Sequence, residues 1–228
     1  MGVTRETFIH YHKLQSDGHL VFNKKLKIIE LGAQTVHFED PNFLTIILSA
    51  LGLDPAVIQN FKYDMASRFM HESFGYTYDC IDLDQLDPLA IPWDLNTAMC
   101  PIEMRQSYNL VTNHGTTEHL IGQANAFRVM HDLTSQGGIM LNILPCIEPN
   151  HGFFSYSPAF FESLAVANQY EVCGRYISET MNRHALRDLH TYTGQITFAP
   201  CYLHYALKKV NNNDFVLPTQ IFNNGVKQ

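Results

Sequence analysis

The sequence predicts one α/β domain in which helices cover both faces of a mostly parallel β-sheet. Short apolar segments alternate along the chain with amphipathic segments of about 10–15 residues, which is the pattern of strands joined by helical crossovers. The last two apolar segments follow each other without a clear helix between them, which indicates an antiparallel pair at one edge of the sheet. Hydrophobic residues make up 46% of the 228 residues and charged residues 16%, enough apolar surface for a single sizeable core.

The predicted strands are short apolar runs bounded by glycine, proline or charged residues. Gly32 ends the first of them and Pro145 ends the fifth. Runs of this length that are apolar throughout are typical of strands buried on both faces. In chain order, the predicted strands cover residues 26–31, 76–83, 90–93, 107–112, 139–144, 170–177 and 197–207.

The predicted helices combine apolar residues at helical spacing with residues that start or stop a helix. Phe8, Tyr11 and Leu14 share one face of the first helix, which Asp17 and Gly18 close. Asp40 is the expected N-cap of the second helix, with Pro41 at its first position. In chain order, the predicted helices cover residues 1–20, 41–51, 55–73, 123–135 and 158–168, and a polar stretch at 178–194 separates the last two strands.

Composition and charge exclude several classes of function. The longest apolar runs fall well short of the roughly 20 residues that a membrane-spanning helix needs. The first residues lack the apolar core of a signal peptide, so we expect a cytoplasmic protein. A net charge of −7 with no basic cluster argues against a nucleic-acid partner. Five cysteines without a CxxC pair argue against a disulfide framework and against a cysteine-based zinc site.

Acidic residues end three successive predicted strands, where an open parallel sheet binds its ligands. Glu30 precedes Gly32, whose missing side chain lets a ligand approach the backbone. Asp82 is placed to accept hydrogen bonds from the two hydroxyls of a ribose, and Asp94 from an exocyclic amine. Each acid alone could instead cap a helix or face solvent, but three in a row favour a nucleoside-containing ligand.

The segments IIELGAQ, YDCIDLD, PWDLN and YNLVTNHGTTEHL, in that order, resemble a class I S-adenosylmethionine-dependent methyltransferase. The segments HDLTSQGG, IMLNILP and HGFFSYSPAFF extend the resemblance, which covers residues 27–208 and is closest to a bacterial-type branch with GTTEH and HGFF segments. It implies a three-layer, Rossmann-like methyltransferase fold with a seven-stranded, mostly parallel sheet and an antiparallel edge strand. It also implies S-adenosylmethionine as the cofactor.

The resemblance assigns cofactor contacts to residues that follow the first strands. Glu30 would face the amino-acid end of the cofactor, Asp82 would bind the ribose, and Asp94 would lie near the adenine amino group. The complete set of implied contacts is Glu30, Gly32 and Gln34, then Asp82 and Leu83, then Asp94 and Leu95, and finally Asn113 and His114 close to the methyl donor.

Two features depart from the common pattern of these enzymes. Gly32 is followed by Ala33, Gln34 and Thr35 in place of further glycines. The Gln34 side chain therefore either takes part in the cofactor loop or points away from it. The spacing from Glu30 to Asp82 is long, which implies a helical insertion at residues 38–74 within a single domain of residues 1–228. Residues 1–26 are expected to form an N-terminal helical lid or extension. A nicotinamide-dependent enzyme would want GxGxxG, which is absent.

Two of the twelve histidines, His119 and His151, are the candidate catalytic residues. They flank the expected cofactor mouth, where a hydroxyl or amine acceptor must lose a proton, although each could instead be structural. We expect Thr116 or Thr117 to cap a helix that begins near Glu118. The HxxxH and HExxH spacings are absent, so no metal site is expected, and His10, His12, His184, His190 and His204 are expected at the surface or in packing.

The predicted function is methyl transfer to a small-molecule or carbohydrate-like (glycan) acceptor, without a nucleic-acid or membrane partner. Two alternatives stay open: a binding module that holds S-adenosylmethionine but does no chemistry, and a nucleotide- or NAD-dependent enzyme on a related sheet. The oligomeric state is not predicted.

Overall fold

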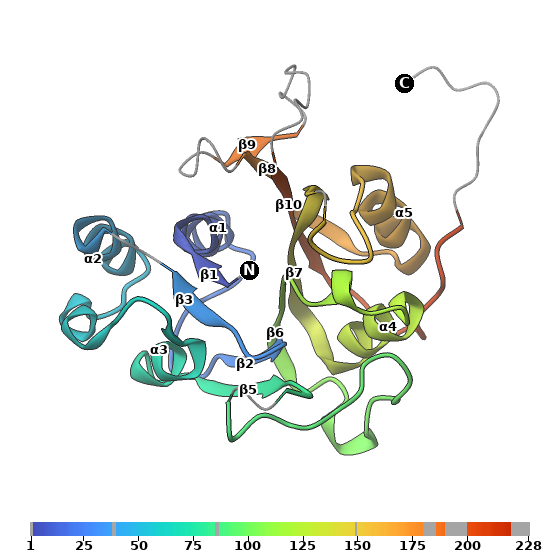
Figure 1. The fold of residues 1–228 in the computed structure, drawn as a ribbon, viewed down its shortest axis with the longest axis horizontal. Coiled ribbons are helices and arrows are strands. Elements are labelled where there is room, and N and C mark those ends of the chain that lie inside the picture. The colour runs from blue at the N-terminus through green and yellow to red at the C-terminus, as the bar shows by residue number, and fades with distance from the viewer. Residues whose placement is uncertain are drawn as a thin grey trace.

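A seven-stranded sheet forms the middle layer of the computed structural model (Figure 1). The structure describes residues 2–37, 40–84, 87–148, 150–179, 186–189 and 200–219. The strand order in the sheet is β5, β2, β6, β7, β10, β8, β9. Their bounds are β2 (Lys27–Leu31), β5 (Thr77–Ile81), β6 (Tyr108–His114), β7 (Thr134–Ile147), β8 (Glu171–Glu179), β9 (Arg187–Asp188) and β10 (Cys201–Lys208).

Four neighbouring strands of this sheet are parallel, and the rest of it is antiparallel. β2 pairs in parallel with β5 on one side and β6 on the other, and β6 pairs in parallel with β7. β10 runs antiparallel between β7 and β8, and β8 pairs antiparallel with β9. The predicted α/β fold class is therefore confirmed. The chain turns from β5 back past β2 to β6, so the topological switch point lies between β2 and β6.

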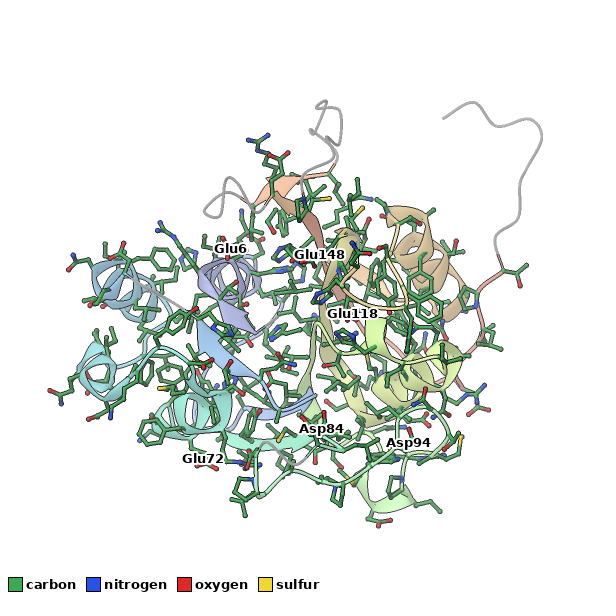
Figure 2. The ribbon with its side chains drawn as sticks, in the orientation of Figure 1. Glu6, Glu72, Asp84, Asp94, Glu118 and Glu148 are labelled. Atoms are coloured by element: carbon green, nitrogen blue, oxygen red, sulfur yellow. The ribbon has the colours of Figure 1, made fainter. Side chains whose placement is uncertain are left out.

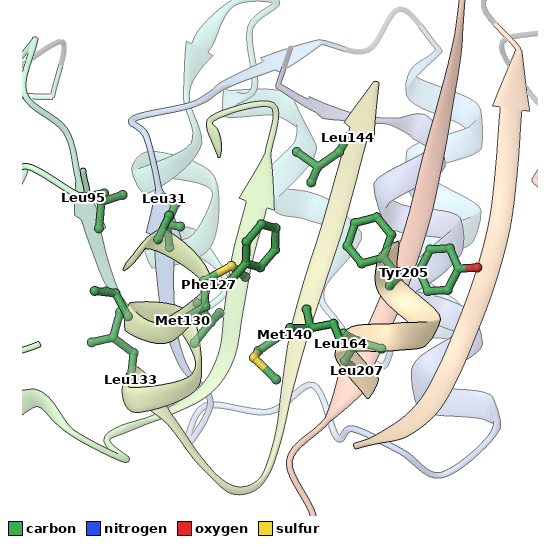
Figure 3. Packing of buried hydrophobic residues seen from close by; sticks show 14 of the residues in the cluster. Leu31, Leu95, Phe127, Met130, Leu133, Met140, Leu144, Leu164, Tyr205 and Leu207 are labelled. Carbon is green, nitrogen blue, oxygen red and sulfur yellow. The ribbon is translucent and has the colours of Figure 1, made fainter. Parts of the chain in front are cut away.

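Helices cover both faces of the sheet, as Figure 1 shows. Three helices lie on one side, α1 (Arg5–Ser16), α2 (Pro41–Ala50) and α3 (Ser67–Ser73), and two lie on the other, α4 (Gln123–Leu133) and α5 (Pro158–Asn168). Because successive side chains of a strand face opposite sides, Ile28 packs in the apolar cluster beneath α1 and α2, and Ile29 packs in the apolar cluster beneath α4 and α5. Figure 3 shows the cluster beneath α4 and α5, where Phe127 and Met130 of α4 pack against the strands.

The start of α2 follows the chemistry that its sequence predicts. The Asp40 carboxylate accepts hydrogen bonds from the backbone N–H groups of Asn42 at 3.0 Å and Phe43 at 3.2 Å. Pro41 occupies the first turn, where its missing N–H costs no hydrogen bond. α1 likewise ends at Asp17 and Gly18, and Gly18 has a φ of 76° that glycine adopts without strain.

The single helix expected at residues 55–73 is wrong. The chain forms a 3₁₀ helix (Pro55–Asn60), strand β4 (Met65–Ala66) and then α3. Phe61 is extended and Asp64 has a φ of 66°, so the backbone leaves the helical region between the two short helices. β4 pairs with β3 (Thr35–His37), which also pairs with β1 (Val3–Thr4), and these three strands form a separate small sheet. The apolar spacing that suggested one helix includes Phe69, which is half exposed.

Two further boundaries differ from the expectation. The strand expected at residues 90–93 is reduced to one bridge between Ile91 and Ile81. The glycines at 137 and 138 do not follow a helix but lie inside β7, which begins at Thr134, directly after α4. They keep pairing with the chain after β10, since Gly137 N donates to Lys209 O at 2.7 Å and Lys209 N donates to Gly138 O at 3.0 Å.

Part of the predicted C-terminal region lies outside the described residues. The strand expected at 197–207 begins at Cys201 in the described part of the chain, and residues 197–199 lie outside it. His184 and His190 also lie outside it. Among the described residues, none of the helices is both long enough and apolar enough to cross a bilayer.

Candidate cofactor and acceptor site

The carboxyl ends of β2, β5 and β6 meet at one edge of the sheet. Leu31, the last residue of β2, is in register with Ile81 on β5 and with Asn113 on β6. Gly32, Asp82 and His114 are the residues that directly follow these three positions. The structure therefore brings together the strand-end residues that the sequence predicts, at the switch point where open α/β sheets bind ligands.

The turn after β2 requires glycine at position 32. Gly32 has a φ of 75°, and its N–H donates to the carbonyl oxygen of Ile81 at 2.7 Å. A Cβ built there would overlap the hydroxyl oxygen of Thr116. The next N–H in the turn, that of Ala33, donates to Asp82 Oδ2 at 2.7 Å. The Gly32 turn and the acid of the second strand are thus fixed to each other.

Thr116 and Gln34 pack against the inner side of this turn. The Thr116 hydroxyl donates to the carbonyl oxygen of Leu31 at 2.5 Å, and Gln34 Nε2 lies 3.2 Å from the same hydroxyl oxygen. Gln34 is only 8% exposed, so its amide supports the turn from within. Sequence reasoning left the direction of Gln34 open and did not identify Thr116 as its partner.

Asp82 has acceptor capacity left for a ligand. Its Oδ2 accepts from Ala33 N and its Oδ1 accepts from Asp84 N at 2.7 Å, so one lone pair on each oxygen has no donor among the described residues. The residue is partly exposed, and Leu83 beside it is 55% exposed. A carboxylate with one free acceptor site on each oxygen fits two vicinal hydroxyls.

Asp94 organises its own loop. Its Oδ1 accepts from both Asn96 N at 2.9 Å and Asn96 Nδ2 at 3.0 Å, and its Oδ2 accepts from the Thr97 hydroxyl at 3.3 Å. These hydrogen bonds, the one from the Asn96 backbone first, lower the pKa of the Asp94 carboxyl. Counting donors in the described part of the chain, Oδ2 keeps acceptor capacity for a ligand amine, whereas Oδ1 already accepts two hydrogen bonds. Leu95 is buried in the core at 4% exposure.

The loop that carries Asp94 is fastened to the start of α4. Gly122 N donates to Asn96 Oδ1 at 3.0 Å, and a Cβ at Gly122 would overlap the Asn96 backbone. Asn125 Nδ2 donates to the carbonyl oxygens of Leu95 at 3.0 Å and Ala98 at 2.9 Å. Sequence reasoning missed Gly122 and Asn125, because neither belongs to a recognised motif.

Glu30 lies beneath the strand ends and is fully buried. Its Oε2 accepts hydrogen bonds of 2.5 Å from the Ser67 and Tyr78 hydroxyls, and His114 Nδ1 lies 3.5 Å from its Oε1. Burial alone would raise the pKa of this carboxyl, but the contacts with His114 and Ser67 and the nearby His71 outweigh it, so the pKa is lowered. Contact between Glu30 and a cofactor ammonium stays a prediction.

Asn113 connects the end of β6 to the segment after it. Its Nδ2 donates to Thr117 Oγ1 at 2.9 Å and to Asn142 Oδ1 at 3.1 Å. The Tyr156 hydroxyl contacts Thr117 Oγ1 at 2.8 Å and Gln123 Oε1 at 2.7 Å. The Thr117 hydroxyl is thus engaged by Asn113 and Tyr156 and does not cap a helix. The expected helix start at Glu118 is wrong: residues Thr117–His119 form a single 3₁₀ turn, and α4 begins at Gln123.

The two candidate catalytic histidines lie next to each other, around Glu118. The His119 and His151 ring centroids are 5.1 Å apart. His151 Nε2 lies 3.3 Å, and His119 Nε2 3.9 Å, from Glu118 Oε1. Glu118 is fully buried, and burial raises its pKa, whereas the His119 side chain is 49% exposed. The structure thus joins two residues that are far apart in the sequence and adds Glu118 to them.

Other histidines are buried rather than placed at the surface. His10 is 0% and His204 is 1% exposed, and His204 Nε2 lies 2.8 Å from the Ser178 hydroxyl. Burial lowers the pKa of His10 to about 3, so its ring is neutral at physiological pH. His71 stacks on Tyr78, and burial lowers its pKa to about 4. For His10 and His204, packing is the alternative that the structure favours.

Neither protein-family models nor curated proteins give a match to this sequence. Solved structures do match this chain. The 1,6-didemethyltoxoflavin-N1-methyltransferase of Burkholderia thailandensis, solved with 1,6-didemethyltoxoflavin and S-adenosylhomocysteine bound, is 9% identical at a TM-score of 0.51; the match covers 90% of this chain and 80% of that one. A putative sarcosine dimethylglycine methyltransferase from Galdieria sulphuraria is 11% identical at a TM-score of 0.52, and the match covers 90% of this chain and 85% of that one. The chain has the methyltransferase fold.

On this methyltransferase fold, the candidate site has two halves. The Gly32 turn with Asp82 and the Asp94 loop forms one half, and its free carboxylate acceptors fit a nucleoside. Glu118, His119 and His151 form the other half. Thr116, which touches the Gly32 turn, lies two residues before Glu118, so the two halves are adjacent.

Proposed function

We propose that this protein is an S-adenosylmethionine-dependent methyltransferase that acts on a small-molecule acceptor. The observation that carries the proposal is the pairing of the Gly32 turn with Asp82 at the switch point of a methyltransferase fold. The similar structure from Burkholderia thailandensis holds S-adenosylhomocysteine together with a small molecule, which supports this class of ligand and acceptor. A carbohydrate-like acceptor falls within the same proposal.

Asp82, Gly32 and Asp94 are proposed to hold the nucleoside part of the cofactor. Asp82 would accept from the ribose hydroxyls through its remaining lone pairs. Gly32 would act through its positive φ, which shapes the turn and leaves room for Thr116 behind it. Asp94 Oδ2 would accept from the adenine amine beside Leu95. Glu30, Gln34, Leu83, Asn113 and His114 complete the proposed cofactor contacts, either directly or by fixing the turn. The cofactor supplies an electrophilic methyl group on a positively charged sulfur.

His119 and His151 are proposed to serve the acceptor. A hydroxyl or amine acceptor must lose a proton as it takes up the methyl group, and these two side chains are the polar groups proposed to assist that loss. Their place beside Thr116, which touches the Gly32 turn, supports this role. Phe8 and Tyr11 of α1 are buried in the apolar cluster that includes Ile28 of the sheet, which favours the proposal that residues 1–26 are an N-terminal helical extension rather than a lid.

The test is methyl transfer from S-adenosylmethionine to a panel of small hydroxyl and amine acceptors, followed as release of S-adenosylhomocysteine. We expect turnover with at least one acceptor. His119→Gln should lower that turnover by about 10²–10⁴-fold, the range for loss of assistance to proton transfer, while the affinity for S-adenosylhomocysteine stays the same. Full turnover by His119→Gln would contradict the role of His119. Tight binding of S-adenosylhomocysteine without turnover on any acceptor would instead identify a binding module.

A further inference from the structure

Glu118, His119 and His151 present three potential metal ligands at one point. One ligand atom from each side chain lies within 4.8 Å of the others. Glu118 and His119 come from the turn after β6, and His151 comes from the segment after β7. Figure 2 labels Glu118 and Glu148, and the His151 ring lies against both, with Nε2 toward Glu118 and Nδ1 toward Glu148.

The Glu118 carboxylate lacks the partners that a buried acid needs. Its side chain is 0% exposed, and no hydroxyl, amide, lysine or arginine side chain in the described part of the chain hydrogen-bonds to either oxygen. Its polar contacts are its own backbone N–H and the two imidazole nitrogens, at 3.3 Å and 3.9 Å. A buried carboxylate with so few donors is costly, and a bound cation is one way to satisfy it.

The spacing of the ligand atoms suits a single ion. Two ligand atoms that are each about 2.1 Å from a metal, at a tetrahedral angle, are about 3.4 Å apart. The distances from Glu118 Oε1 to the two histidine nitrogens lie close to this value. Small rotations of the His119 side chain, which is half exposed, would close the longer of the two.

The surroundings orient His151 for such a role. Its Nε2 faces Glu118, and its Nδ1 lies 3.8 Å from Glu148 Oε2, longer than a hydrogen bond. A small side-chain movement would bring Glu148 into the position from which a carboxylate orients a metal-binding histidine. The segment that carries His151 is tied to Glu118, because Phe153 N and Phe154 N donate to the Glu118 carbonyl oxygen at 2.8 Å and 3.2 Å. The ligands are therefore held together by backbone contacts that do not depend on an ion.

We propose that Glu118, His119 and His151 bind one divalent transition-metal ion. Two imidazoles and a carboxylate suit Zn²⁺ and Fe²⁺ and leave at least one coordination position open. The exposed side of His119 gives an ion a path from solvent. The sequence predicts no metal site, because its ligands come from two segments and form no spacing motif.

The use of this ion rests on the proposed function, although its binding does not. Beside the Gly32 turn, an ion with an open position would bind an acceptor hydroxyl and lower the pKa of that hydroxyl. His119 and His151 would then assist the acceptor as ligands of the ion rather than as bases themselves.

Metal binding is tested on the full chain after treatment with a chelator. Zn²⁺ is titrated by calorimetry, and Co²⁺ is titrated by visible absorption, which reports coordination by protein ligands. We expect one equivalent of each ion. Glu118→Gln and His151→Ala should each weaken Zn²⁺ binding by more than about 100-fold, and Glu148→Gln by about 10–100-fold, as for loss of an orienting carboxylate.

His19→Asn is the matched control, since His19, Glu171 and Cys173 form the other group of this kind among the described residues. His19→Asn should leave Zn²⁺ binding unchanged. Absence of Zn²⁺ and Co²⁺ binding by the unaltered protein would overturn the proposal, as would binding that survives in both Glu118→Gln and His151→Ala. Binding of S-adenosylhomocysteine is measured in the same samples: its retention in the variants shows that they are folded, and its absence from the unaltered protein would contradict the proposed function without touching the metal site.

Discussion

The pKa of the buried Glu30 carboxyl is lowered, first by contact with His114, and two hydroxyl groups also donate to this carboxylate. The Tyr78 hydroxyl donates to Glu30 Oε2 at 2.5 Å in a fully buried setting. Tyr78→Phe should lower the free energy of unfolding by about 1.5–3 kcal/mol, the range for a hydrogen bond to a charged group. Urea unfolding near neutral pH measures this. Tyr76→Phe is the control, because the Tyr76 hydroxyl is equally buried and has no hydrogen-bond partner among the described residues.

The hydrogen bond between Tyr78 and Glu30 also predicts that the effect of Tyr78→Phe on stability depends on pH. The pKa of Glu30 is lowered by folding, so the stability that the charged form contributes is present above the unfolded value and is lost as pH falls through the folded value. The difference between the unaltered protein and Tyr78→Phe should therefore shrink in acid. A difference that is constant from neutral to acidic pH, or a loss in Tyr76→Phe as large as in Tyr78→Phe, would show that the donor to Glu30 is not the cause.

Two substitutions at Asp94 test whether this residue contacts the cofactor in addition to organising its own loop. Asp94→Asn keeps one oxygen acceptor, whereas Asp94→Leu removes both and also frees Asn96 and Thr97. We expect the affinity for S-adenosylhomocysteine to fall more in Asp94→Leu than in Asp94→Asn, as measured by calorimetry. Equal affinities in the two variants would mean that Asp94 is not an adenine contact.

At the scale of residues, sequence reasoning finds those whose position alone carries meaning. Gly32 and Asp82 directly follow buried apolar runs, so the end of a parallel strand predicts both of them. Other site residues act through contacts with distant segments: Thr116 with Leu31, Glu118 with His151 and Gly122 with Asn96. No local pattern marks these contacts, which join segments that are distant in the chain.

The 3₁₀ turn Thr117–His119 contacts the segment after β7, and this contact joins two elements at the proposed acceptor side. Gly152 lies against it, and a Cβ there would come within 2.8 Å of Glu118 Cγ and 2.9 Å of the Glu118 carbonyl oxygen. Gly152→Ala should force the two segments apart and lower stability by about 1–3 kcal/mol, as overpacking does. Hydrogen exchange should speed up at Phe153 and Phe154, whose N–H groups donate to Glu118, and not in β10. Unchanged exchange at both residues would contradict this docking.

Helices and strands can be predicted from the sequence where one local pattern favours a single structure. The cap at Asp40 and the apolar run of β2 each specify one structure, and both form as expected. Between residues 55 and 73, helical spacing competes with a left-handed residue at Asp64 and with pairing of β4 to β3, and the tertiary pairing prevails. Strands of two or three residues, such as β1 and β4, show no periodicity that a sequence could reveal.

For the whole molecule, alternating strands and helices predict the fold class, and the order of the strands follows less directly. The parallel part arises from helical crossovers, which the sequence shows as amphipathic segments. The insertion of β10 between β7 and β8 depends on pairing between distant segments. The residues of the proposed cofactor half could be predicted because they stand at strand ends. The Glu118–His119–His151 group needed the three-dimensional structure.

The central claim is that the Gly32 turn and Asp82 form a cofactor site, and calorimetric titration with S-adenosylhomocysteine tests it most directly. The unaltered protein should bind one equivalent. Asp82→Ala should weaken binding by about 10–150-fold, which corresponds to about 1.5–3 kcal/mol for hydrogen bonds to a charged group. Asp84→Ala, which removes an equal charge two residues away, should bind as the unaltered protein does. No binding by the unaltered protein, or equal affinities in Asp82→Ala and Asp84→Ala, would contradict the account.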